Sequence, residues 1–102
     1  MPGADNPFAI GSDLWPGISK LIEECGELNQ VCGKLIATEG HSAHWDGTNL
    51  YERLTEELAD VLAAIEFVVA YNESLDSQAV FKRVDRKYRT FEDWHNGIRN
   101  AH

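Results

Sequence analysis

The fold class is decided by the stretch ISKLIEECGELNQVCGKL, residues 18–35. Its apolar side chains recur at intervals that alternate between three and four residues, at Ile18, Leu21, Cys25, Leu28, Cys32 and Leu35. That spacing predicts an amphipathic helix with one apolar face. Asp13 is expected to cap its N-terminus, Pro16 to lie in its first turn, and Gly40 to follow its end.

Two further helices are predicted by the same criterion. After a loop over residues 38–49, in which Thr48 or Asn49 can cap the next helix, a second apolar stripe consists of Tyr51, Leu54, Leu58, Val61, Ile65 and Val68. A polar break over 72–77 precedes a third stripe, made of Phe81, Val84, Tyr88 and Phe91 and extended by Trp94 or His95. Gly97 is expected to end the regular part of this helix. No strand pattern competes, so the predicted fold class is all-α, a small bundle of about three main helices.

Length and composition indicate one domain. The chain has 102 residues, of which 43% are hydrophobic. Residues 1–12 contain two prolines and two glycines and are expected to be loosely ordered, and residues 13–102 are expected to form the domain. Because three helices enclose only a small core, we expect a homo-oligomer, either a dimer or a dimer of dimers, to complete it.

The net charge and the cysteines indicate which binding partners and which cellular compartment to expect. A net charge of −8 argues against binding to nucleic acid or to an anionic membrane. The two cysteines, Cys25 and Cys32, are seven residues apart on one predicted helix, too far apart for a disulfide. No signal-peptide pattern is visible, and the longest apolar stretch, 61–71, is broken by Glu66. These features predict a location in the cytoplasm.

Each of the first two helices carries a pair of acidic residues three positions apart, and the four residues are Glu24, Glu27, Glu57 and Asp60. A spacing of three places both members of a pair on one face of a helix. Aligned on a heptad, both pairs occupy the same position just outside the apolar stripe. Four carboxylates on two packed helices repel one another unless a hard cation lies between them. Oxygen ligands of this kind suit Mg²⁺ better than Zn²⁺, which prefers cysteine and histidine.

A basic segment offers a second candidate for ligand binding. Five of the nine lysines and arginines lie between Lys82 and Arg89. They could hold phosphate groups, or they could form ordinary surface pairs with Asp76, Asp85 and Glu92. Together with a Mg²⁺ site, the first alternative favours phosphoryl or nucleotidyl chemistry.

The acidic motif Glu23-Glu24-x-x-Glu27 with Glu57-x-x-Asp60, on two amphipathic helices of a short chain, resembles the MazG-like nucleotide pyrophosphohydrolases of the all-α NTP pyrophosphatase superfamily. The resemblance covers about residues 15–88. It implies a hydrolase acting on acid anhydrides that needs Mg²⁺, with Mn²⁺ as an alternative. Such an enzyme cleaves a (d)NTP between its α- and β-phosphates to (d)NMP and pyrophosphate, in nucleotide-pool house-cleaning.

The resemblance also implies roles for individual residues. Glu24, Glu27, Glu57 and Asp60 would be catalytic metal ligands, and Glu23 would bind a further metal or help to activate water. The region of Lys82, Arg86 and Lys87 corresponds to where the family places phosphate-binding residues. Tryptophans more often pack in a core, but Trp15 is the candidate for stacking on a base.

Two alternatives remain open. One is a phosphoribosyl-ATP pyrophosphatase, from the same superfamily. The other is a non-catalytic helical module that binds metal for stability or mediates interactions. The segment between the two acidic motifs is long for the family, and the loop from His41 to Trp45 is predicted to be a local elaboration. The motif does not specify the base or the sugar.

Overall fold

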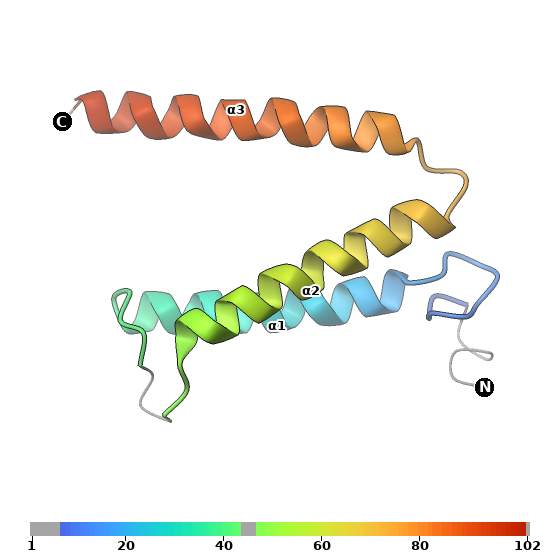
Figure 1. The fold of residues 1–102 in the computed structure, drawn as a ribbon, viewed down its shortest axis with the longest axis horizontal. Coiled ribbons are helices and arrows are strands. Elements are labelled where there is room, and N and C mark those ends of the chain that lie inside the picture. Colours follow the sequence, from blue (N-terminus) through green and yellow to red (C-terminus); the bar gives the residue numbers. More distant parts are fainter. Residues whose placement is uncertain (1–6, 44–46, 102) are drawn as a thin grey trace. The chain divides into compact units, whose positions relative to one another are not determined.

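A computed structural model describes residues 7–43 and 47–101 of the chain. These residues form three helices, α1 (Ile18–Ala37), α2 (Leu50–Tyr71) and α3 (Ser77–Ala101), and no strand (Figure 1). The predicted all-α class with three main helices is therefore confirmed. The chain divides into two compact units, Met1–Asn72 and Glu73–His102, which are described separately.

In the first unit, α1 and α2 lie side by side and run in opposite directions (Figure 1). Of the two predicted candidates, Thr48 and Asn49, it is Asn49 that caps α2: its side chain accepts hydrogen bonds from the backbone amides of Tyr51 and Glu52, both at 3.1 Å. Gly40 follows the end of α1 as predicted, with a φ of 86° and an amide that donates to the Leu35 carbonyl at 2.8 Å.

The predicted start of α1 is wrong. The helix begins at Ile18 and not near Asp13, so Pro16 lies before the first turn. Gly17 occupies the N-cap position with a φ of 92°, and no side chain caps the helix. The left-handed backbone of Gly17 is buried against Phe67, where a Cβ atom would lie 2.7 Å from the ring atom Cδ1. Tertiary packing against α2 therefore sets the start of α1 in place of a local cap.

The helix faces that meet are displaced by one residue from the predicted apolar stripes. Val31 is buried on α1, whereas the predicted core residue Cys32 is exposed. On α2 three of the four buried positions, Leu50, Glu57 and Ala64, are spaced by seven residues, and the fourth is Val68 of the predicted stripe. The contact between the helices is thus centred on the heptad position that contains acids, and Glu57 lies inside this contact rather than just outside it.

Several large apolar side chains of the two helices stay exposed beside this contact. Tyr51 and Leu58, both predicted to be core residues, are 55% and 46% exposed. Further large apolar side chains of α1 and α2 with more than half of their surface exposed are Ile22, Ile36, Leu62 and Tyr71. The first unit therefore presents more apolar surface than a packed helical pair needs to expose.

The second unit consists mainly of α3. The polar break is confirmed, and Asp76 within it accepts a hydrogen bond from the Ala79 amide at 3.1 Å. The predicted end at Gly97 is wrong, because α3 continues to Ala101. A glycine inside a helix costs only about 1 kcal/mol, and Ile98 continues the apolar stripe beyond it. None of the described residues of α3 is buried.

The segment before α1 is held by backbone and side-chain hydrogen bonds. The Ser12 hydroxyl donates to the carbonyls of Pro7 and Ala9, and the Ser19 amide donates to the Phe8 carbonyl at 2.9 Å. Residues 1–6 of the predicted loosely ordered segment lie outside the described residues. So do His44 and Trp45 of the predicted loop elaboration. Within the described ranges, no helix is long and apolar enough to cross a membrane.

Candidate metal centre

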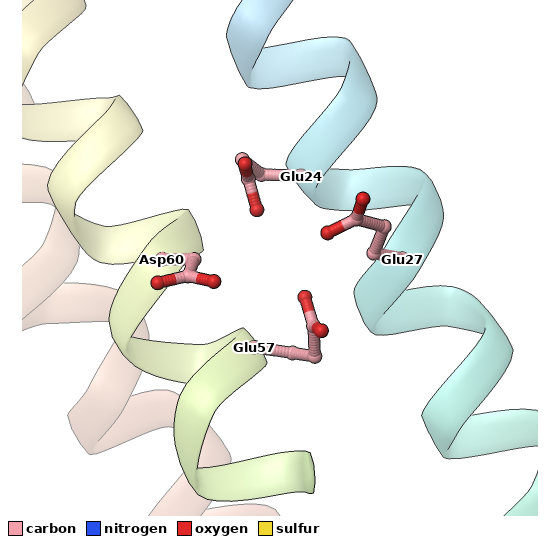
Figure 2. Close-up of side chains that lie close together, drawn as sticks. All are labelled: Glu24, Glu27, Glu57 and Asp60. Atoms are coloured by element: carbon pink, nitrogen blue, oxygen red, sulfur yellow. The ribbon is translucent and has the colours of Figure 1, made fainter.

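The two acidic pairs meet between α1 and α2 (Figure 2). Glu24 and Glu27 project from α1, and Glu57 and Asp60 project from α2 toward them. Each residue contributes one carboxylate oxygen to a group in which all four oxygens lie within 4.8 Å of one another. The predicted metal ligands are therefore brought together by the helix pair, with two ligands from each helix.

The four carboxylates differ in how deeply they are buried. Glu57 is 6% exposed, Glu24 and Glu27 are half-buried, and Asp60 is exposed. One oxygen of Glu24 and one of Glu57, in both cases Oε2, are buried without a hydrogen-bond partner. A buried carboxylate oxygen without a donor is costly, and a hard cation is the group that satisfies several such oxygens at once. The residues present thus fit a divalent cation.

Arg53 forms an ion pair with Glu57. Its Nη2 atom lies 3.2 Å from Glu57 Oε1, in an ion pair across one turn of α2. The guanidinium therefore occupies one oxygen of this buried carboxylate and leaves Oε2 unpartnered. Arg53 supplies part of the positive charge that permits Glu57 to be buried.

Repulsion within the cluster changes the proton affinity of Glu27. The negative charge of Glu24 raises the pKa of the Glu27 carboxyl above its ordinary value, and loss of hydration and the neighbouring Glu57 add to this effect. A raised pKa means that Glu27 accepts a proton more readily than a carboxylate in water.

Glu23 lies outside the group of four. Its Oε2 atom is 3.0 Å from Lys20 Nζ, in a surface ion pair within α1. The hydrogen bond to Glu23 raises the pKa of the Lys20 ammonium, with the charge of Glu23 as the next cause. Glu23 is thus adjacent to the cluster along the chain, and its role in water activation stays a prediction.

The predicted substrate-binding residues are not part of the cluster. Lys82, Arg86 and Lys87 are exposed residues of α3, in the second unit, and Lys87 Nζ lies 5.6 Å from the centre of the Phe91 ring. Arg89, from the same basic segment, pairs with Asp85 at 3.3 Å. Trp15 is 39% exposed, with a φ of 48°. The predicted contacts of these residues with substrate stay predictions.

Sequence reasoning missed three residues around the cluster. Lys20 and Arg53 each precede a member of the cluster by four residues, a spacing that places side chains side by side on a helix. That spacing could have identified both of them. Gly17 could not have been identified in this way, since its close contact with Phe67 depends on how α1 and α2 pack.

An all-helical domain with four converging carboxylates is compatible with a protein that binds a divalent cation. The model of one family, the MazG nucleotide pyrophosphohydrolase domain, matches residues 17–94. The chain therefore belongs to this family, and its family function is nucleotide pyrophosphohydrolysis, a hydrolase reaction. This confirms the resemblance drawn from the acidic motif. Neither a curated protein nor a solved structure matches the chain.

Proposed function

We propose that this protein is a Mg²⁺-dependent nucleoside triphosphate pyrophosphohydrolase that converts (d)NTP to (d)NMP and pyrophosphate. The observation that carries the proposal is the convergence of four carboxylates with two buried, unpartnered oxygens. Family membership supplies the class of reaction. Removal of unwanted nucleotides from the cytoplasmic pool is the biological role that fits this chemistry.

Glu24, Glu27, Glu57 and Asp60 would hold the cation, and Mn²⁺ could replace Mg²⁺ at such a set of oxygen ligands. When bound, a divalent cation offsets the charge of the triphosphate and lowers the pKa of water. Four carboxylates carry more negative charge than one divalent ion neutralises. A second cation is therefore compatible with the site.

The chain's own groups would position and deprotonate the attacking water. Glu27 is the first candidate for the base, because its carboxylate lies within the cluster at which the attacking water would be held. Glu23 is the second candidate, and it would have to leave its ion pair with Lys20 to act. Arg53 would keep the Glu57 carboxylate oriented toward the other three.

The leaving pyrophosphate needs positive charge that the described acidic cluster does not provide. We assign this role to Lys82, Arg86 and Lys87, whose side chains are exposed on α3. Trp15 is proposed to contact the base. Replacing Lys82 or Lys87 by methionine should raise the KM for a triphosphate while the Mg²⁺-dependent shift in Tm stays unchanged.

A homo-oligomer, as a dimer or a dimer of dimers, is part of the proposal. It rests on the apolar side chains that the pairing of α1 and α2 leaves exposed, among them Leu58, Leu62 and Ile22. A second copy of the chain is the partner that would cover these side chains. Sedimentation at micromolar concentration should show a dimer or tetramer, and a stable monomer would contradict this part of the proposal.

The enzymatic proposal is tested by measuring pyrophosphate release from a panel of (d)NTPs with Mg²⁺ or with EDTA. Glu27→Gln should abolish release. Glu66→Gln, the same change at an exposed site of α2 outside the cluster, is the matched control and should keep full activity. No release from any nucleotide, or full activity of Glu27→Gln, would refute the proposal.

The same assay separates the two alternatives. Faster release from phosphoribosyl-ATP than from any triphosphate would favour the phosphoribosyl-ATP pyrophosphatase. Stabilisation by Mg²⁺ without turnover of any of these compounds would favour a non-catalytic metal-binding module.

A further inference from the structure

A cavity of about 350 Å³ opens beside the carboxylate cluster, within the first unit. Two members of the cluster, Glu24 and Asp60, form one part of its lining. The apolar side chains of Ile10, Ala63 and Phe67 form another part. The cavity thus joins the candidate metal site directly to an apolar surface, and its volume is at the lower end of the range for sites that bind small molecules.

The apolar part of this cavity is held in a fixed shape. The Phe67 ring stacks on Tyr71, with ring centres 4.5 Å apart and planes inclined by 22°. The Gly17 backbone lies so close to the other side chains of this wall that a Cβ atom there would overlap Phe67. Asn72 ties the same segments together by donating hydrogen bonds to the carbonyls of Pro16 and Val68, at 3.0 and 2.7 Å. The wall is therefore formed before a ligand binds.

The lining restricts the chemistry of the ligand. Apart from the two carboxylates, Lys20 is the only described lining residue with a polar side chain. A ligand that fills the cavity must carry an anionic group that a cation links to Glu24 and Asp60. It must also carry a compact, largely apolar body that fits against Phe67 and Ile10. A planar heterocycle joined through a sugar to a phosphate chain has this combination of properties.

We infer that this cavity receives the nucleoside part of the substrate, with its base against Phe67 and with Ala63 setting the space available to that base. The inference rests on the proposed function and identifies the part of the same site that selects the substrate. Ala63 is the exposed member of the alanine pair on α2 that lines the cavity, so a larger side chain there enters the cavity without replacing a buried core residue.

Ala63→Leu tests the inference, and Ala70→Leu is the matched control, because Ala70 is an exposed alanine of the same helix outside the cavity. Ala63→Leu should raise the dissociation constants of deoxynucleoside monophosphates, measured by calorimetry with Mg²⁺ present, by about tenfold or more, and most for the purines. The shift in Tm caused by Mg²⁺ alone should equal that of the wild type in both variants, because neither change touches the four carboxylates.

The outcomes separate this inference from the proposed function. If the wild type hydrolyses nucleotides and Ala63→Leu binds all monophosphates as the wild type does, the cavity is not the nucleoside site, and the proposed function still stands. If Ala63→Leu and Ala70→Leu weaken binding equally, the effect is not local and the inference is equally wrong. A wild type that binds neither Mg²⁺ nor nucleotide would instead refute the proposed function on which the inference rests.

Discussion

Replacing Glu57 by glutamine should change the stability of the protein in opposite directions with and without metal. Glu57 is the most buried member of a cluster in which four carboxylate oxygens lie within 4.8 Å of one another. Without a cation these charges repel, so removal of one charge should stabilise the fold. With a cation the same change removes a ligand, so the stabilisation by metal should be lost.

The magnitude follows from Coulomb's law. Two unit charges 4.8 Å apart repel by about 1 kcal/mol at the dielectric constant of water and by about 3.5 kcal/mol at an effective value of 20. The change also removes the charge that pairs with Arg53; because Glu57 is buried, this loss exceeds the roughly 0.5 kcal/mol of an exposed pair across one helical turn, and it offsets part of the relief from three repelling carboxylates. We therefore expect the metal-free variant to be more stable by about 1 kcal/mol or more, which raises the Tm by about 4–8 °C.

The assay is thermal unfolding of the wild type and of Glu57→Gln, each in EDTA and in Mg²⁺. At a Mg²⁺ concentration one hundred times the dissociation constant, the wild type should gain about 2.7 kcal/mol. The order of the two Tm values should then be reversed, with the wild type higher. If Glu57→Gln is less stable than the wild type in EDTA and gains as much from Mg²⁺, the four carboxylates do not form a cation site.

Three other predictions concern pH and packing. The pKa of the Glu27 carboxyl is raised above 4.5 in the folded protein. The contribution of Glu27 to stability is therefore fully present below the pKa that this group has in the unfolded chain. It is lost as the pH rises through the pKa that the group has in the folded protein. Urea unfolding in EDTA should show this loss in the wild type and a smaller one in Glu27→Gln. Gly17→Ala should lower the Tm more than Gly40→Ala. Both glycines have a positive φ, but only at Gly17 would an added Cβ atom meet a neighbour, 2.7 Å from Phe67. Equal decreases in Tm would contradict the close contact between Gly17 and Phe67. Asn72→Ala removes two hydrogen bonds at a buried site and should cost about 1–3 kcal/mol in chemical unfolding, and an unchanged midpoint would show that these bonds do not hold the loop before α1.

The elements of this fold could be predicted from local patterns. The alternating three- and four-residue spacing identified three helices, and the cap of α2 was narrowed to Thr48 or Asn49, of which the structure uses Asn49. The start of α1 could not be identified in this way. It depends on the packing of Gly17 against Phe67, two residues that are far apart in the sequence.

The membership of the acidic cluster could also be predicted, but its burial could not. The spacing of the carboxylates identified the four residues that meet. Hydrophobic patterns place an acidic residue at the edge of a stripe, and therefore Glu57 was expected outside the contact between the helices. In the structure the buried residues of α2 are Leu50, Glu57 and Ala64, each one position before a place in the heptad expected to be apolar, together with Val68 of the predicted stripe. A pattern of apolar residues cannot predict that Glu57 is buried, because its burial is favoured by Arg53 and by the cation that we propose.

The most direct test of the central claim is a reaction in water labelled with oxygen-18, with Mg²⁺ and the triphosphate that the enzyme cleaves fastest. Mass spectrometry then locates the label in the products. If Glu24, Glu27, Glu57 and Asp60 form the site of attack on the α-phosphorus, the label should enter the nucleoside monophosphate, and Asp60→Asn should give no labelled product. Label in the pyrophosphate, or equal labelling by wild type and Asp60→Asn, would contradict the account.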